Sequence, residues 1–142
     1  MLRIAQRNAN GLQQHKEVVK LFLKQNLIDI ILVSETHFTN KNHYSIPEYD
    51  RCYTCHPHGT AHGGTAIVIK NTIEYYERPK YGEAAIQATS VTVSCLSHKI
   101  TIAAVYFPPR HNLKEVNFEA FFQTLGPRFL AGGDYNSKHT LW

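Results

Sequence analysis

The segment from Leu27 to Val33 constrains the fold most, because it is short, almost entirely apolar and rich in β-branched residues. Such a run is typical of a β-strand that other layers cover on both faces. Before it, apolar and polar residues alternate from Leu2 to Gln6, which predicts a first strand ending near Asn8. Between these strands, the segment from His15 to Gln25 has apolar residues at helical spacing and a stripe of lysines on the opposite side. The opening therefore predicts a strand, a helix and a buried strand.

The next part of the chain is typical of antiparallel sheet. A polar loop is expected over 36–47, and four strands follow it. These strands are expected from Tyr49 to Cys55, from Thr65 to Lys70, from Ile86 to Cys95 and from Lys99 to Phe107. Turn-forming residues, above all Gly63-Gly64 and Ser97-His98, predict hairpins and hence antiparallel pairing.

A second helix is predicted near the C-terminus. Its apolar residues follow helical spacing at Phe118, Phe121, Phe122 and Leu125. Asn112 lies three positions before Glu115, as in a capping arrangement at a helix start. A short strand from Arg128 to Ala131 then leads into Gly132-Gly133-Asp134. Because the chain ends soon after this motif-like segment, we expect residues 1–142 to be the N-terminal part of one domain.

Composition excludes several classes of protein. With 43% hydrophobic residues among 142, the chain can build one folded core, which excludes a disordered, collagen-like or coiled-coil protein. Apolar runs such as Ile30 to Val33 are too short to span a bilayer and the N-terminus lacks a signal-peptide core, so no membrane partner is expected. Three cysteines fit a reducing compartment better than a disulfide framework. The net charge of +4 favours a polyanionic partner only weakly.

Three polar side chains stand at the ends of expected strands: Asn8, Glu35 and Asp134. Strand ends of layered α/β folds converge on a common crevice, so the three could share one site, although a single carboxylate at a strand end is usually only solvated. Glu35 emerges from an apolar strand and needs a cation or several donors to stay ionised. Mg²⁺ would supply that charge and would also stabilise charge on a phosphoryl transition state.

Asp134 and Asn136 lie two positions apart behind paired glycines. Asp134 could orient a water molecule, and the amide of Asn136 could hold a phosphate oxygen. An Asx-rich turn without a catalytic role is an equally good interpretation.

Two further patterns have simpler structural interpretations. The run Cys52-Tyr53-Thr54-Cys55-His56 matches a haem-attachment pattern and, with His58 and His62, could form a zinc site. We expect neither site. Haem attachment is disfavoured because no secretory signal accompanies the run and because the run lies in an expected strand, where alternate residues face inward and outward. A structural zinc site is disfavoured because no second cysteine pair would complete it. Basic and aromatic residues could also line a nucleic-acid surface, but such scattered residues commonly reflect solvation and core packing. They are Lys70, Lys80, Arg110, Lys114, Tyr106, Phe107 and Trp142.

Taken in order, five segments resemble the successive motifs of the endonuclease/exonuclease/phosphatase superfamily. They are Arg7-Asn8-Ala9-Asn10-Gly11-Leu12, Ser34-Glu35-Thr36-His37, Gly63-Gly64-Thr65-Ala66-Ile67, Val105-Tyr106-Phe107-Pro108-Pro109 and Gly132-Gly133-Asp134-Tyr135-Asn136. Within the superfamily, the chain is most similar to the apurinic-type endonuclease domain of non-LTR, jockey-like retrotransposon polyproteins, whose Asp-Tyr/Phe-Asn motif continues as in residues 137–142.

The resemblance implies an α/β (α+β) fold: a four-layered sandwich of two mixed, largely antiparallel β-sheets flanked by helices, here with its second half incomplete. It implies hydrolysis of a DNA phosphodiester with Mg²⁺, or alternatively Mn²⁺, and a nick whose 3′-hydroxyl primes reverse transcription. The implied partners are double-stranded DNA and, in a full-length polyprotein, its reverse transcriptase domain. The implied location is the nucleus, after synthesis in the cytoplasm.

The resemblance also implies roles for individual residues. Glu35 would be a metal ligand, Asn8 would support the metal and the carboxylate, and Tyr106 would contact the scissile phosphate. Asp134 would position the attacking water, and Asn136 would hold a phosphate oxygen. Asn10 would add a metal contact, weaker than the Asp of repair-type relatives but similar to the retrotransposon branch.

One departure from the family pattern concerns its final motifs. The family completes its site with a later Asp and a Ser-Asp-His segment, and the chain ends at Trp142 before either; His139 does not match that histidine. We therefore expect a truncated domain with little or no activity, and poor solubility from an exposed sheet edge. The alternatives are a phosphatase or lipid phosphodiesterase on the same scaffold, or a non-catalytic remnant that binds DNA or protein.

Overall fold

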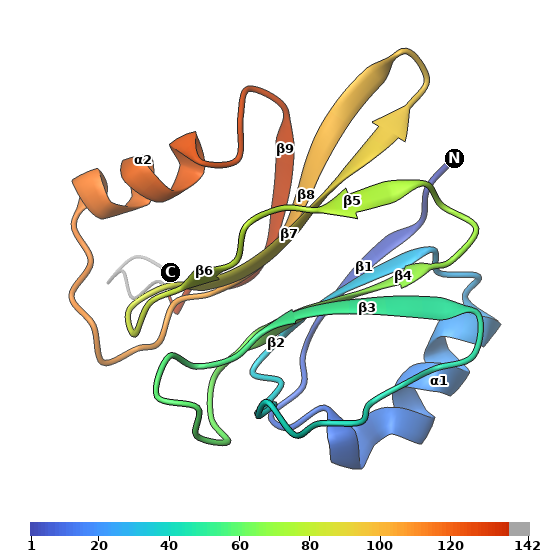
Figure 1. Ribbon diagram of the computed structural model, residues 1–142, viewed down its shortest axis with the longest axis horizontal. Coiled ribbons are helices and arrows are strands. Elements are labelled where there is room, and N and C mark those ends of the chain that lie inside the picture. The colour runs from blue at the N-terminus through green and yellow to red at the C-terminus, as the bar shows by residue number, and fades with distance from the viewer. Residues whose placement is uncertain (137–142) are drawn as a thin grey trace, which may run out of the picture.

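The computed structural model describes residues 1–136 and places two mixed β-sheets face to face, with a helix on the outer side of each (Figure 1). The first sheet contains, in spatial order, β1 (Ile4–Asn8), β2 (Ile30–Ser34), β4 (Thr65–Lys70) and β3 (Tyr49–Thr54). The second contains β5 (Tyr75–Glu77), β7 (Gln87–Cys95), β8 (His98–Tyr106) and β9 (Phe129–Asp134), with the short β6 (Tyr81–Gly82) also paired to β7. The helices are η1 (Gln13–His15), α1 (Lys16–Gln25) and α2 (Glu115–Gln123).

Each sheet mixes parallel and antiparallel pairs. The strand pairs β1–β2 and β8–β9 are parallel, whereas the remaining pairs are antiparallel. Both parallel pairs are joined through a helix, as the length of a parallel crossover requires. As a result, the carboxyl ends of all four parallel strands point toward the same end of the sandwich.

Three apolar clusters hold the four layers together. Side chains of β2 and β4, such as Leu32 and Ile67, meet Val91 and Ile102 of the second sheet between the two sheets. The opposite face of the first sheet packs on α1, and the opposite face of the second packs on α2, where Phe121 is fully buried. Each fully buried aliphatic or aromatic side chain contributes about 1.5–3 kcal/mol relative to exposure. These clusters explain why β2 is buried along its whole length.

Most of the elements predicted from the sequence are present. The strand pattern at the start, the loop over 36–47 and the strand Thr65–Lys70 are confirmed, and so are the two hairpins at Gly63-Gly64 and Ser97-His98. The first and second of these hairpins belong to different sheets, so β4 and β7 face each other across the core. The short strands β5 and β6 were not predicted, because segments of three and two residues carry no periodicity.

Two predicted boundaries are wrong. The α2 helix is not capped by Asn112 and Glu115: its N-cap is Lys114, whose backbone N–H donates to Asn117 Oδ1 at 2.9 Å. The last strand does not end at Ala131 but continues to Asp134, since β8 supplies parallel partners as far as that residue. Local sequence cannot reveal a partner strand, and glycines in the segment hide its strand character.

Strand β9 forms one edge of the second sheet. Phe129 and Leu130, at its start, are 40% and 44% exposed. An exposed apolar edge strand favours association, so the predicted poor solubility stays a prediction with a structural reason. Within residues 1–136, no helix is long and apolar enough to cross a membrane.

Candidate active site

The carboxyl ends of the parallel strands bring together side chains from both sheets. Asn8 ends β1, Glu35 follows β2 directly, and Asp134 ends β9. The amide Nδ2 of Asn8 donates to Glu35 Oε2 and also to Asp134 Oδ2, the latter at 2.9 Å. A single amide therefore joins two carboxylates that are far apart in the sequence. The structure thus brings the three predicted strand-end residues into one cluster.

Tyr106 completes this cluster from the end of β8. Its hydroxyl donates to Glu35 Oε1 at 3.2 Å, and its side chain is only 7% exposed. Burial raises the pKa of Tyr106 to about 12, and the negative charges of Glu35 and Asp134 act in the same direction. The phenol therefore stays protonated at neutral pH and can act as a hydrogen-bond donor.

The backbone at Glu35 is held in the left-handed region, with φ of 53°. This conformation costs a non-glycine residue about 1–2 kcal/mol, so surrounding contacts must hold it. Gly11 N donates to Glu35 O at 2.8 Å, and His37 N donates to Gly63 O at 2.9 Å. The turn after β2 is therefore fastened on one side to the β1–α1 loop and on the other to the β3–β4 loop, which aims Glu35 at the cluster.

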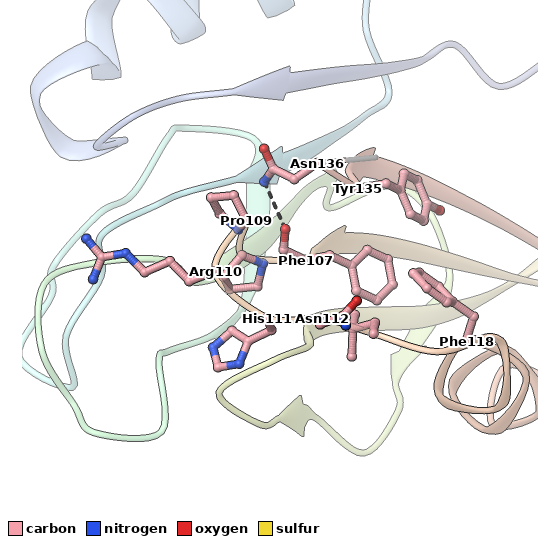
Figure 2. Close-up of a pocket in the computed structure, with 10 residues that line it drawn as sticks. Phe107, Pro109, Arg110, His111, Asn112, Phe118, Tyr135 and Asn136 are labelled. Carbon is pink, nitrogen blue, oxygen red and sulfur yellow. Dashed lines mark hydrogen bonds between the residues drawn. The ribbon is translucent and has the colours of Figure 1, made fainter. Parts of the chain in front are cut away.

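Asn10 and Asn136 lie beside the cluster, each in the left-handed region. Asn10 donates its backbone N–H to Asn8 Oδ1 at 3.2 Å, whereas no hydrogen bond within residues 1–136 joins its side chain to either carboxylate. Asn136 donates its backbone N–H to Asp134 Oδ1 at 2.9 Å and its Nδ2 to the carbonyl of Phe107 at 2.8 Å (Figure 2). The Asx turn predicted as an alternative is thus present, and it orients the Asp134 carboxylate.

A pocket of about 640 Å³ adjoins Asn136 (Figure 2). Its floor is aromatic, formed by Phe107, Phe118 and Tyr135, and its rim carries Asn136 and Arg110. An apolar floor with a polar rim suits a group that has a flat apolar face and polar edges. The pocket therefore extends the site from the carboxylates toward α2.

Gln87 supports the site, although no sequence motif singled it out. It is fully buried at the start of β7, and its Oε1 accepts the Gly64 N–H at 2.7 Å. Its Nε2 donates to the carbonyls of Glu83 and Ala84 at 3.2 and 3.3 Å. A Cβ at Gly63 would lie 2.5 Å from Gln87 Oε1, so a side chain there would displace the Gln87 amide. Gln87 thereby holds the Gly63-Gly64 turn. The carbonyls of this turn accept hydrogen bonds from the backbone N–H groups of the two residues after Glu35.

Replacing Gln87 with Leu is expected to lower the free energy of unfolding by about 1–3 kcal/mol, since the buried Gly64 N–H and two carbonyls lose their partner. Urea denaturation followed by circular dichroism measures this change. The control is Gln123→Leu at the exposed end of α2, which should change stability by less than about 0.5 kcal/mol. Equal losses in the two variants would contradict a specific role for Gln87.

The cysteines and the lysines of the weaker sequence patterns lie in different parts of the fold. Cys52 packs between the two sheets while Cys55 packs against the α1 side, so the two thiols lie on opposite faces of the first sheet. Within residues 1–136, no group of three or more His, Cys, Asp or Glu side chains is arranged so that it could hold a metal ion. Lys70 pairs with Asp29 at 3.5 Å and Lys80 with Glu77 at 3.4 Å, and Phe107 is in the core. The suggested basic and aromatic surface is therefore not one surface; Trp142 and His139 lie outside the described residues.

Comparison with known proteins agrees with this arrangement. The sequence model of the endonuclease/exonuclease/phosphatase family matches residues 5–142. The chain belongs to the endonuclease/exonuclease/phosphatase family. The likeness to jockey-type elements inferred from the motifs is also confirmed: the RNA-directed DNA polymerase from mobile element jockey of Drosophila melanogaster is 34% identical over 141 residues, covering 99% of this chain. The corresponding protein of Drosophila funebris is 33% identical over 132 residues, covering 93%.

The fold of this family member matches that of a solved relative. The endonuclease domain of TRAS1, a telomere-specific non-LTR retrotransposon, superposes with a TM-score of 0.74 at 20% identity and covers 100% of this chain. The predicted two-sheet sandwich with flanking helices is confirmed. The chain spans 62% of that solved domain, and 15% and 14% of the two jockey proteins.

Proposed function

We propose that this chain is the N-terminal part of a Mg²⁺-dependent DNA endonuclease domain of a non-LTR retrotransposon, which nicks target DNA so that the new 3′-hydroxyl primes reverse transcription. The observation that carries the proposal is the Asn8 amide shared by the carboxylates of Glu35 and Asp134. The jockey relatives are described as RNA-directed DNA polymerases of mobile elements, and the solved relative as a retrotransposon endonuclease domain. These descriptions support DNA as the substrate.

The cluster fits a hard divalent cation. Two carboxylates converge, and within residues 1–136 neither forms an ion pair with a basic side chain. Mg²⁺ is commonly bound through one or two carboxylates together with water and phosphate oxygens, and Mn²⁺ accepts the same ligands. Glu35 would hold the ion, with Asn10 as a further ligand. When bound, such an ion would stabilise negative charge on the phosphate.

The chain's own residues would carry the remaining roles. Asp134 would accept a proton from the attacking water, because its carboxylate is oriented by hydrogen bonds from Asn8 and Asn136. Tyr106 would exchange the hydrogen bond that its phenol donates to Glu35 for one to the scissile phosphate when DNA binds, since the phenol stays protonated. Asn136 would hold a phosphate oxygen with the Nδ2 hydrogen that Phe107 does not use. Asn8 would keep the two carboxylates at a set separation.

The proposal extends to partners and location. Double-stranded DNA would be the substrate, the reverse transcriptase domain of the same polyprotein would use the nick, and the nucleus would be the place of action. That this chain by itself has little or no activity stays a prediction. It rests on the later Asp and the Ser-Asp-His segment of the family pattern, neither of which is found among the 142 residues.

Substrate choice tests the proposal. Supercoiled plasmid, a soluble inositol phosphate and phospholipid vesicles are each incubated with this chain, and with a version extended along its natural reading frame, in Mg²⁺ or in EDTA. We expect Mg²⁺-dependent conversion of plasmid to the nicked form, above all by the extended version, and no hydrolysis of the other two substrates. Preferential hydrolysis of the lipid or inositol phosphate would favour the phosphatase alternative. DNA binding without nicking by either version would favour the non-catalytic remnant.

A further inference from the structure

Four of the nine histidines form one cluster, and three of them line a cleft together with Tyr106. His56, His58 and His62 belong to the β3–β4 loop, where the ring centroids of His56 and His62 are 3.9 Å apart and those of His56 and His58 are 5.1 Å apart. His111 comes from the β8–α2 loop and is close enough to influence the charge of His56. The catalytic roles proposed above use none of these imidazoles.

The imidazoles of His56, His62 and His111 border a cleft of about 540 Å³ between the two loops. Its polar lining consists of His56, His62, His111, Arg110 and Tyr106, and no carboxylate lines it within residues 1–136. In Figure 2, Arg110 and His111 point away from the aromatic rings of Phe107 and Phe118, and so away from the pocket floor. The cleft therefore differs in charge from the carboxylate cluster, although Tyr106 belongs to both.

We propose that this imidazole cleft, defined by His56, His62, Arg110 and His111, binds a DNA backbone phosphate that neighbours the scissile one, and binds it more tightly as pH falls. The proposal rests on the DNA endonuclease function proposed above. Arg110 is always charged and presents several donors to a phosphate. Tyr106 lines the cleft and also donates to Glu35, so a strand whose scissile phosphate lies at Glu35 would have a neighbouring phosphate beside the cleft.

The pH dependence follows from the groups that surround His56. His58 and His62 face it from its own loop, His111 and Arg110 from the β8–α2 loop, and Tyr106 from the end of β8. Burial lowers the pKa of His56, and the neighbouring imidazoles lower it further. The backbone N–H of His58 donates to His56 Nδ1 at 3.2 Å, so the neutral ring carries its proton on Nε2.

A bound phosphate supplies the opposite charge that this cluster lacks. It favours the protonated form of each imidazole in the cleft, so binding takes up protons. Binding that takes up protons becomes tighter as pH falls, so the affinity of the cleft for phosphate should increase at lower pH. The charged cleft also releases counterions from DNA, so its removal should reduce the salt dependence of binding.

Fluorescence anisotropy of a labelled 25-base-pair duplex tests the inference, in EDTA and at constant ionic strength. Between pH 8 and pH 6, the wild-type chain is expected to gain about tenfold in affinity, while the double variant His62→Ala/His111→Ala gains less than about twofold. The matched control is His43→Ala/His98→Ala, two exposed histidines outside the cleft, which should retain the wild-type dependence. Circular dichroism confirms that the variants are folded.

Titration of the free chain with inorganic phosphate, followed by imidazole NMR signals, separates two kinds of failure. If DNA binds and the double variant keeps the full pH dependence, the function proposed above stands and the imidazole cleft is overturned as a phosphate site. If phosphate shifts the His62 and His111 signals but DNA does not bind at any pH, the cleft is an anion site and DNA is the wrong substrate. Loss of the pH dependence in the control variant would also overturn the assignment.

Discussion

Replacing Asp134 with Asn is expected to lower plasmid nicking by about 10³-fold, within the range of 10²- to 10⁴-fold that a positioned general base contributes. The variant keeps the shape of the side chain and an oxygen that can accept the Asn136 N–H. It removes the negative charge and the carboxylate oxygen that accepts the hydrogen bond from the Asn8 amide. The same carboxylate would take the proton of the attacking water. The measurement is the initial rate of nicking of supercoiled plasmid in Mg²⁺. It uses whichever is more active, this chain or the version extended along its natural reading frame.

Asp50→Asn is the matched control. Asp50 is an exposed aspartate on β3 that accepts a hydrogen bond from the Tyr75 hydroxyl at 3.0 Å, away from the cluster. Its replacement should leave the nicking rate within about twofold of wild type. A similar loss of nicking in both variants would show a general effect of charge on DNA binding rather than a catalytic role. Retention of more than a tenth of the rate in Asp134→Asn would remove Asp134 from the mechanism.

Replacing Gly133 with Ala is expected to be the most destabilising substitution in the site, by about 3 kcal/mol or more. A Cβ at this position would lie 1.9 Å from the carbonyl oxygen of Val105 on the neighbouring strand β8. Because that atom belongs to the backbone, relief requires the β8–β9 pair to separate. The strand pair also carries Tyr106 and Asp134 at its end, so the same change should disorganise the site.

Two other glycines provide a graded comparison for thermal denaturation. At Gly132 a Cβ would meet the flexible end of the Leu32 side chain at 2.9 Å, which can move. At Gly82 the nearest atom, Thr54 Cγ2, would be at an ordinary 3.5 Å. The expected loss in melting temperature therefore increases from Gly82→Ala to Gly132→Ala and then to Gly133→Ala. A melting temperature for Gly133→Ala within about 2 °C of Gly82→Ala would contradict the close approach of the strands.

The repeating patterns of the sequence predicted the individual elements well. Alternation along β1, the apolar run of β2 and the helical spacing of α1 are local properties, because a strand or helix buries the face that its own periodicity defines. Predictions failed where the cause was not local. The end of β9 is such a case, because it depends on pairing with β8. The cap of α2 is a different case: it is a local contact, in which Asn117 Oδ1 accepts the Lys114 N–H, and the prediction chose Asn112 instead.

The candidate site was partly predictable for a related reason. Asn8, Glu35 and Asp134 could be chosen because each polar residue follows an apolar strand. Gln87 could not be chosen in this way, because in the sequence it is a single amide within a strand pattern. Its importance comes from the hydrogen bond that it accepts from the Gly64 N–H in the folded chain. The histidines of the imidazole cleft were visible as residues, but only the meeting of two loops joins His111 to the others.

The sequence by itself determined the faces of the strands and helices, the family and the residues that could carry chemistry, since these depend on residue type and spacing. The tertiary structure alone decided which strands share a sheet, so that β4 and β7 lie in different sheets, and that one Asn8 amide reaches two carboxylates. Periodicity specifies which side of an element is buried but not against which partner. That choice is made by the packing of all four layers together, and it places Glu35 and Asp134 within reach of the same amide.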